Sequence, residues 1–223
     1  YVGMLYEEDP NVCHRKSMGI VLKRRDNADI VKDVYGGIID ILMEGEGRIP
    51  YAIDYLKKKL QDLVDENIPM EKLIITKSLR SDYKNPMQIA HKVLADRMGK
   101  RDPGNKPGPG DRIPFVYIAT QDKKALQGDR VEHPQYVTDN KVKLDYVFYI
   151  TNQIMKPVVQ VFALVLEKIP DFKSKMLKAR KFQKELDGLR KTLTHEEAEK
   201  KVANLRNKEV EKLLFQPFID KLN

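Results

Sequence analysis

Residues 18–27 organise the chain, and they read Met18-Gly19-Ile20-Val21-Leu22-Lys23-Arg24-Arg25-Asp26-Asn27. The first half of this stretch has the alternation of a β-strand. Three consecutive cations follow, and the Asp-Asn pair after them suits the start of a helix. A strand that ends in cations at a helix N-terminus gathers positive charge in a small space. A site of this kind is suited to binding phosphate.

The triplet Lys23-Arg24-Arg25 has two interpretations. It is either a phosphate clamp or a solvated strand end with one ion pair to Asp26. Consecutive strand residues point to opposite faces, so the three side chains cannot grip one phosphate together. We therefore expect at least one of these cations to pair internally or to pack elsewhere.

The length and the net charge of the chain limit the classes to which the protein can belong. The 223 residues suffice for one large domain or two small ones, and the net charge of +8 favours a polyanionic partner, although many enzymes share that charge. The single cysteine, Cys13, excludes internal disulfides and predicts a reducing, intracellular compartment. No apolar run approaches the roughly 18 residues that span a bilayer, so we expect no membrane partner. The chain begins at Tyr1 rather than Met, and we expect it to be a piece of a longer protein.

Hydrophobic periodicity predicts the first half of the fold. Residues 1–22 are expected to form two strands around an acidic turn, with the return strand at 17–22. A helix should follow on the apolar face that starts at Ile30 and should end at Gly45 and Gly47. A second helix should begin at Pro50 and pack antiparallel to the first, with Gly36-Gly37 allowing close approach.

The second half is predicted to alternate short strands with helices. We expect strands at 72–77 and 113–120, a helix from Asn85-Pro86 to Met98, and a long helix over 144–169 with a kink at Pro157. From residue 171 the chain holds fourteen Lys and Arg against nine acids, which indicates a charged helical extension. Thr194-His195-Glu196-Glu197 has the form of a capping box. The fold class is therefore α+β and predominantly helical.

The residues offer cationic sites but no evident catalytic site. The basic, Pro- and Gly-rich loop at 100–112 is either a solubilising loop or a second phosphate contact, since Arg97, Lys100, Arg101, Lys106 and Arg112 gather around it. The four histidines are scattered, and Cys13-His14 lacks further ligands at the spacing of a zinc site. We assign no catalytic residue and no metal ligand.

Several motifs occur together in one order, and they carry a resemblance. They are Met18-Gly19-Ile20 through Asp26-Asn27, Glu71-Lys72-Leu73-Ile74-Ile75-Thr76-Lys77, Asp82-Tyr83, Ala90-His91, Ala95-Asp96-Arg97-Met98, Lys100-Arg101-Asp102-Pro103-Gly104, Gly110-Asp111-Arg112-Ile113-Pro114, and Asp145-Tyr146 through Tyr149, Gln153 and Lys156-Pro157. In this order and spacing the chain, from residue 1 to about 169, resembles the C-terminal part of family B DNA polymerases. It is most similar to the delta-type enzymes and those of large DNA viruses.

The resemblance implies a domain plan and a set of DNA contacts. Residues 1–26 would be the end of the palm, 27–170 the thumb that grips the primer–template duplex, and 171–223 a helical extension like that of large-virus enzymes. The residues implied to contact the DNA backbone are Tyr1, Lys23, Arg24, Arg25, Lys77, Arg80, Arg97, Arg101 and Arg112.

The resemblance also implies what this segment lacks. The family's Asp-x-x-Ser-Leu-Tyr-Pro and Asp-Thr-Asp motifs are absent, so the segment alone should be inactive, and the Mg²⁺ of the parent enzyme should bind elsewhere in that chain. Implied partners are duplex DNA, the rest of the polymerase chain and a processivity factor. The apolar cluster near the C-terminus is formed by Leu213-Leu214-Phe215 and Phe218. It could either pack back on the thumb or dock the processivity factor. We favour packing.

Two rival functions remain open at this point. One is a non-catalytic nucleic-acid-binding or processivity-factor-binding module. The other is a helical interaction protein without a DNA role, whose binding would ignore salt.

Overall fold

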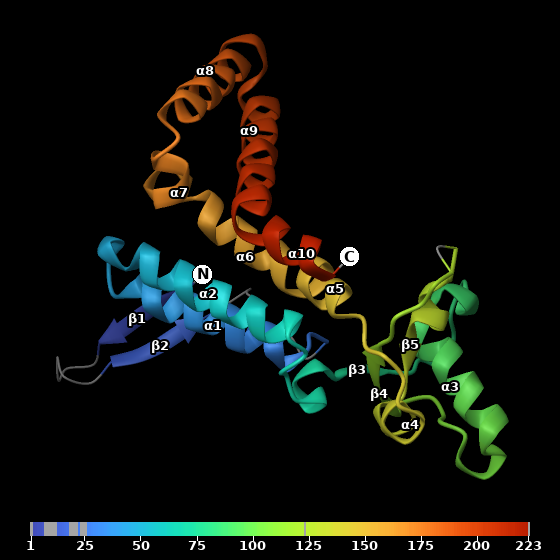
Figure 1. The fold of residues 1–223 in the computed structure, drawn as a ribbon. Helices are drawn as coiled ribbons and strands as arrows, with labels where there is room; N and C mark the ends of the chain where they lie inside the picture. The colour runs from blue at the N-terminus through green and yellow to red at the C-terminus, as the bar shows by residue number, and fades with distance from the viewer. Residues whose placement is uncertain (1, 7–12, 18–21, 23–25, 123, 223) are drawn as a thin grey trace. The chain divides into compact units, whose positions relative to one another are not determined.

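The computed structural model describes residues 2–6, 13–17, 22, 26–122 and 124–222, and the chain forms two compact units. The first unit comprises residues 1–33 and 68–145, and the second comprises residues 34–67 and 146–223. Figure 1 shows the elements of both, mostly helical with short strands. The predicted α+β, predominantly helical class is confirmed.

The first unit contains two small antiparallel sheets. Strands β1 (Val2–Tyr6) and β2 (Cys13–Ser17) form a hairpin in which Val2 pairs with Ser17. Strands β3 (Ile75–Ser78), β4 (Arg112–Tyr117) and β5 (Val131–Glu132) form the other sheet, with β4 in the middle. The strand that pairs with β1 begins at Cys13, earlier than the expected return strand at 17–22, and the two share only Ser17. The expected residues 18–21 lie outside the described part of the chain.

Two helices accompany the three-stranded sheet. Helix α3 (Ala90–Arg101) follows a 3₁₀ turn at Pro86–Gln88, and α4 (Pro134–Asn140) follows β5 directly. The N-terminus of α4 has Pro134 in its first turn, and its N-cap His133 accepts a hydrogen bond from the Gln135 N–H at 3.2 Å. Leu94, Phe115, Val116 and Val131 are buried in the core of this unit.

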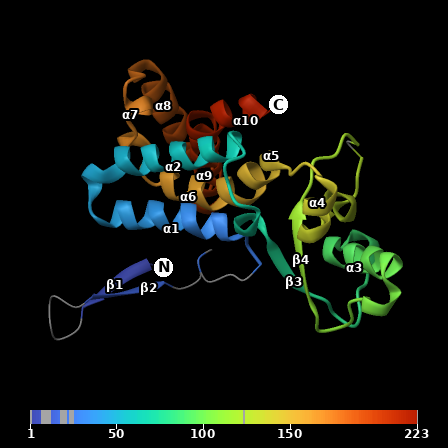
Figure 2. The ribbon, with the colours of Figure 1, turned by 60° about the horizontal axis from the view of Figure 1, so that its bottom comes forward.

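A pair of antiparallel helices opens the second unit. Helix α1 (Asp29–Met43) ends before Gly45, which adopts a positive φ of 131°, and α2 (Ile49–Val64) begins with Pro50 in its first turn. Figures 1 and 2 show the two helices side by side and antiparallel. A Cβ atom added to Gly37 would lie 2.5 Å from the Tyr55 ring, so the predicted close approach at this glycine is confirmed.

The expected long helix at 144–169 is divided into several segments. They are α5 (Tyr146–Phe148), a π-helical segment (Tyr149–Ile154), α6 (Met155–Ala163) and a 3₁₀ turn (Leu166–Lys168). The chain stays helical from Tyr146 to Ala163, and its irregularity is the π-helical segment just before Pro157. The proline ring clashes with the carbonyl of the residue four positions earlier, which is Gln153 in the π-helical segment. The wider turn places the irregularity where that clash would occur.

The extension is helical, as predicted. It contains α7 (Pro170–Lys173), α8 (Met176–Thr192), α9 (His195–Val210), a π-helical segment (Glu211–Phe215) and α10 (Gln216–Leu222). Helix α9 does start after Thr194, but the capping-box hydrogen bonds to the backbone do not form. The Thr194 hydroxyl donates instead to the Glu197 carboxylate at 2.8 Å.

The apolar cluster near the C-terminus packs inside the second unit. Leu214 and Phe215 are fully buried, and Phe218 is 9% exposed. Helix α10 lies against α2, and Lys221 Nζ donates to Gln61 Oε1 at 2.7 Å. The packing interpretation of this cluster is therefore confirmed.

Candidate nucleic-acid interface

A cationic hollow lies at the paired ends of β3 and β4 in the first unit. Its volume is about 590 Å³, and three exposed cations line it: Lys77, Arg80 and Arg112. The other lining residues are Asp26, Thr76, Ser78, Tyr83, Ile89 and His91. The hollow therefore combines positive charge with hydroxyl and imidazole groups.

Sheet pairing brings two of the cations together across the strands. Arg112 is the first residue of β4, and it lies opposite Ser78, the last residue of β3. Its guanidinium donates from Nη1 to Ser78 Oγ and from Nη2 to the Thr76 carbonyl, both at 3.2 Å. Lys77 precedes Ser78 on the same strand. The Arg112 head group is thus oriented by the strand that also carries Lys77.

Hydrogen bonds beyond the strands fix the loop that carries Arg80. The Leu79 N–H donates to the Asp111 carbonyl at 2.8 Å, and the Gly110 N–H donates to the Leu79 carbonyl at 2.9 Å. Gly110 has a φ of 94°, a conformation that glycine adopts without strain. Leu79 is buried, so this turn is anchored by packing as well as by its hydrogen bonds.

Tyr83 and His91 hold the other wall of the hollow. The Arg80 backbone N–H donates to the Tyr83 hydroxyl at 2.8 Å, and that hydroxyl lies 3.1 Å from His91 Nε2. The two rings meet edge to face at 5.9 Å. These contacts tie the loop after β3 to the first turn of α3, and they place the Arg80 backbone without occupying its guanidinium.

The electrostatics of the hollow are those of an anion site. Burial lowers the pKa of His91, and the positive charges of Lys77 and Arg80 lower it further, while a backbone hydrogen bond with Ser78 opposes them. Among the described lining residues, Asp26 is the one carboxylate, against three cations. Guanidinium, ammonium and hydroxyl donors together suit a phosphate group.

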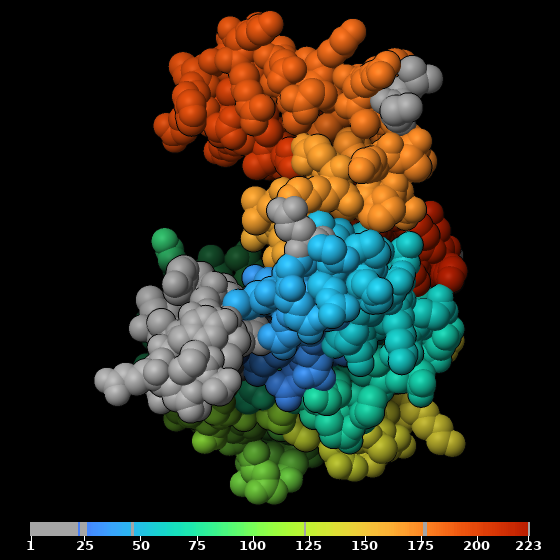
Figure 3. Space-filling model, turned by 90° about the vertical axis from the view of Figure 1, so that its left-hand side faces the viewer, coloured from blue at the N-terminus to red at the C-terminus, as the bar shows by residue number. Residues whose placement is uncertain are grey.

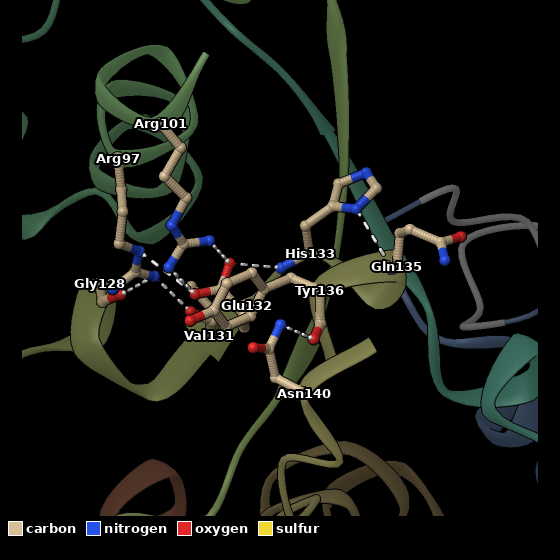
Figure 4. Close-up of polar contacts among 9 residues, drawn as sticks. All are labelled: Arg97, Arg101, Gly128, Val131, Glu132, His133, Gln135, Tyr136 and Asn140. Atoms are coloured by element: carbon tan, nitrogen blue, oxygen red, sulfur yellow. Dashed lines mark hydrogen bonds and ion pairs between the residues drawn. The ribbon is translucent and has the colours of Figure 1, made fainter. Parts of the chain in front are cut away.

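Arg97 and Arg101 belong to a different cluster, which is centred on Glu132 (Figure 4). Arg101 Nη1 and Nη2 donate to the two Glu132 oxygens at 3.1 and 3.0 Å, and its guanidinium lies 3.7 Å from the centre of the Tyr136 ring. Arg97 Nη2 donates to the Val131 and Gly128 carbonyls at 2.6 and 3.1 Å. This cluster joins α3 to β5, so both arginines have structural partners.

The structure thus divides the residues that we expect to contact DNA. It brings Lys77, Arg80 and Arg112 together at one hollow, and it places Arg97 and Arg101 in the Glu132 cluster. Tyr1, Lys23, Arg24 and Arg25 lie outside the described residues. Contact with DNA stays a prediction for all nine.

Sequence reasoning missed the groups that support the cations. Tyr83 and His91 belong to the quoted motifs, but their mutual hydrogen bond depends on a turn that local patterns do not predict. Glu132 and Tyr136 belong to none of the quoted motifs, so the sequence indicated their role less clearly than that of Tyr83 and His91. The spacing of Arg97 and Arg101, four residues apart on one helix face, could have indicated a shared acidic partner.

Within the described residues, no three His, Cys, Asp or Glu side chains lie close enough to share a metal ion. No helix of the described chain combines the length and the apolar character needed to cross a bilayer.

The chain is similar in sequence to known proteins along most of its length. The sequence model of DNA polymerase family B matches residues 1–165. The DNA polymerase of Pyramimonas orientalis virus is 52% identical over 229 aligned residues, which cover 100% of this chain and 18% of that protein. The DNA polymerase of Acanthamoeba polyphaga mimivirus is 53% identical over 75% of this chain and 10% of its own length. The DNA polymerase delta catalytic subunit of Glycine max is 35% identical over 75% of this chain and 15% of its own.

A solved structure has a similar fold. The family B DNA polymerase of Pyrobaculum calidifontis matches 60% of this chain and 17% of its own, with a TM-score of 0.51 and 20% identity. The chain spans less than a fifth of the length of these relatives. The matched family model covers most of the chain, and the viral and delta-type relatives agree with it: the chain belongs to DNA polymerase family B.

Proposed function

We propose that this chain is a segment of a DNA-directed DNA polymerase, and that it grips the primer–template duplex through the phosphate backbone. Family membership supports the first part, together with relatives that are named DNA polymerases. The second part rests on the hollow at the ends of β3 and β4. In it Lys77, Arg80 and Arg112 are exposed and converge from a strand, a loop and a second strand.

The hollow suits phosphate contact better than base reading. Phosphate contacts need cations and hydroxyl donors, whereas base reading needs side chains that reach the base edges in a groove. Arg112 is oriented by Ser78 and the Thr76 carbonyl. Its guanidinium has five N–H donors, so donors remain available for a ligand after these two hydrogen bonds.

The proposed mechanism is electrostatic retention of the product duplex. A thumb that binds phosphates without reading bases holds any sequence equally and lets the duplex advance by one step at a time. Loss of these cations should therefore shorten the stretch copied per binding event more than it alters the choice of nucleotide. Tyr83 and His91 act as positioning residues, because they hold the loop that carries Arg80.

The predicted contacts outside the hollow are expected to contribute less to DNA binding or are proposed from the sequence alone. Arg97 and Arg101 already bind Glu132 and backbone carbonyls, so we expect a smaller contribution from them. The Lys23-Arg24-Arg25 triplet and Tyr1 are proposed as contacts at the junction of palm and thumb on the sequence alone. A processivity factor remains a proposed partner of the extension. It would have to bind residues other than Leu214 and Phe215, which are buried.

The chemistry of the parent enzyme is proposed to lie outside this segment. The described residues do not supply a cluster of acids that could hold a metal ion. We propose that the Mg²⁺ and the catalytic aspartates of the parent chain come from other segments, and that this chain alone is inactive. The proposed setting is a reducing intracellular compartment, either the host nucleus or a cytoplasmic site of viral replication.

Equilibrium binding of the 223-residue chain to labelled duplex DNA tests the proposal. We expect the logarithm of the affinity to fall linearly with the logarithm of the salt concentration, by about 0.9 for each phosphate neutralised. Two duplexes of unrelated sequence should bind alike, because phosphates are common to both. Binding that ignores salt, or that depends strongly on sequence, would contradict the proposal.

A further inference from the structure

Residues 15–25 hold five Lys and Arg residues and no acid, and positive charge is also concentrated in a second short segment, residues 173–191. This segment holds eight Lys and Arg residues and two acids, Glu185 and Asp187. Its net charge of +6 compares with +8 for all 223 residues. The end of α7, the short link after it and α8 therefore carry this net charge of +6.

The neighbouring helix has no such excess. Residues 195–212, which include α9, hold five Lys and Arg residues and five Glu residues. Helices α8 and α9 are partners in one hairpin, and both present a charged outer face to the solvent. Their sharp difference in net charge means that a general need for solubility does not account for the charge of α8.

The cations of α8 fall into two groups. Lys178 forms an ion pair with Glu209, which is buried, and Arg190 Nε lies 3.0 Å from Glu199 Oε1, so these two bind α8 to α9. The second group is exposed and makes no ion pair with any acid that the structure describes. It consists of Arg180, Lys181, Lys184 and Lys191. The pairing of the first group explains the fold of the hairpin and leaves the second group without a structural role.

The acids near the second group are engaged or few. Glu167 lines a hollow together with Arg180, but Arg206 holds both of its oxygens at 2.5 and 2.7 Å. Asp187 accepts a hydrogen bond from Gln183 Nε2 at 2.9 Å. Glu185 is exposed on α8 itself. The four exposed cations therefore present largely uncompensated charge.

These cations lie along one side of the helix. Arg180, Lys184 and Lys191 are spaced by four and seven residues, which places them within about 40° of one another around the axis, and Lys181 stands beside them. They extend over about 16 Å of helix, which corresponds to roughly five base pairs of axial rise in duplex DNA. Figure 3 shows this part of the chain, in orange, as an open surface.

The apolar side of α8 argues against a membrane as the partner. A helix that lies in a membrane interface needs a free apolar face. In α8 the side chain of Leu186 is buried, and Phe182 packs edge to face on Phe172 with ring centres 5.6 Å apart. Among the described side chains of α8, no large apolar one is classed as exposed. Within these described side chains, the outward face thus offers charge without an exposed large apolar group.

We propose that the exposed side of α8 is a second nucleic-acid-binding surface, which takes the phosphodiester backbone of DNA without reading its bases. This surface goes beyond the thumb hollow, and the choice of nucleic acid as its ligand rests on the proposed function of the parent enzyme. It lies beyond residues 1–165, the part that matches the family model. It would therefore add a DNA contact to those that the matched part makes. A relative with 52% identity covers the whole chain, extension included.

The test compares two variants of the full 223-residue chain that lose equal charge. The first carries Arg180→Gln, Lys181→Gln, Lys184→Gln and Lys191→Gln on α8. The second carries Lys200→Gln, Lys201→Gln, Lys208→Gln and Lys212→Gln in and beside the balanced helix α9, where all four lysines are exposed. Binding is measured by fluorescence anisotropy over a salt series, with a labelled duplex and with a single strand of the same sequence. Far-UV circular dichroism checks that both variants keep their helices.

The α8 variant should bind the duplex at least about tenfold more weakly at 0.1 M salt, with a salt slope flatter by about 3 to 4, or about 0.9 per cation. The α9 variant should lose less than about threefold. A variant with Lys181→Arg, Lys184→Arg and Lys191→Arg keeps the charge and should bind like the wild type. The single-strand arm should show the same loss with a smaller slope change, since the slope is about 0.7 per phosphate there.

Three results would overturn the inference. The first is equal loss in the α8 and α9 variants, and the second is an α8 variant that binds DNA like the wild type. The third is an α8 variant that loses binding to phosphatidylserine vesicles while its DNA binding is unchanged. If substitutions at Lys77, Arg80 and Arg112 abolish duplex binding while the α8 variant retains it, the inference about α8 fails and the proposed function stands.

Discussion

Glu132 binds Arg101 through both carboxylate oxygens, at 3.1 and 3.0 Å, although only 4% of the Glu132 side chain is exposed. Arg97 approaches the same carboxylate at 3.4 Å, and the His133 N–H donates to it at 2.9 Å. A buried carboxylate is tolerated when cations and hydrogen-bond donors surround it. This cluster fastens α3 to the edge strand β5.

Removal of the central carboxylate should destabilise the first unit. Glu132→Ala leaves two arginines without their shared partner, one of which, Arg97, already has a buried Nε that makes no hydrogen bond among the described residues. We expect a loss of about 3 kcal/mol in the free energy of unfolding, measured by urea denaturation. The exposed Glu185→Ala should change it by less than about 0.5 kcal/mol. Equal effects of the two substitutions would show that the cluster contributes nothing.

Two glycines should respond to alanine in opposite directions. In α1, Gly37→Ala places a Cβ atom about 2.5 Å from the Tyr55 ring, so the ring must move. In α8, Gly188→Ala meets open space. Alanine favours a helix over glycine by about 1 kcal/mol, so Gly188→Ala should stabilise the chain by roughly that amount. Gly37→Ala should instead destabilise it by about 1 kcal/mol or more. Thermal melts of both variants measure the difference, and stabilisation by both would refute the close packing of α1 on α2.

The pKa of His91 should respond to what fills the hollow. Burial and the charges of Lys77 and Arg80 lower this pKa, against the opposing hydrogen bond with Ser78. Above about pH 6.5 the imidazole is neutral in both the folded and the unfolded chain. Below that pH the unfolded chain takes up the proton more readily, so the folded state loses stability as the pH falls.

NMR titration of the His91 ring measures this effect, and His91→Gln assigns the signal. We expect an apparent pKa below 6.5 in the free chain and a higher value once duplex DNA is added, because phosphate offsets the charges of Lys77 and Arg80. The unfolding free energy of His91→Gln should also depend less on pH between 7 and 5. A free-chain pKa at or above 6.5 would show that burial and the charges of Lys77 and Arg80 do not dominate at this imidazole.

Local patterns predicted the elements whose cause is local. The helix pair α1 and α2 follows from apolar periodicity, from Gly45 and from Pro50, all of which act within a few residues. The helical extension and its charged outer face follow from the same kind of signal. The pairing of β1 with Cys13–Ser17 was not predicted, because hairpin register is set by pairing across the turn rather than by the strand sequence alone.

Features that join distant residues could not be predicted. Arg97 and Arg101 meet Glu132 across 35 and 31 positions, and the sequence shows them only as members of a basic stretch. The convergence of Lys77 and Arg112 depends on the register of β3 against β4. The helix before Pro157 accommodates the proline by forming a π-helical segment. Apolar periodicity does not distinguish a π-helical turn from an α-helical one, so this segment could not be predicted.

The salt dependence of duplex binding by a variant of the hollow tests whether Lys77, Arg80 and Arg112 hold the DNA backbone. Lys77→Ala, Arg80→Ala and Arg112→Ala together remove the three cations, and Lys200→Ala, Lys201→Ala and Lys208→Ala form a control of equal charge. We expect the hollow variant to flatten the salt slope by about 2 to 3, at about 0.9 per cation, while the control keeps the slope of the wild type. A hollow variant with the affinity and slope of the wild type would contradict the claim that this site grips the DNA backbone.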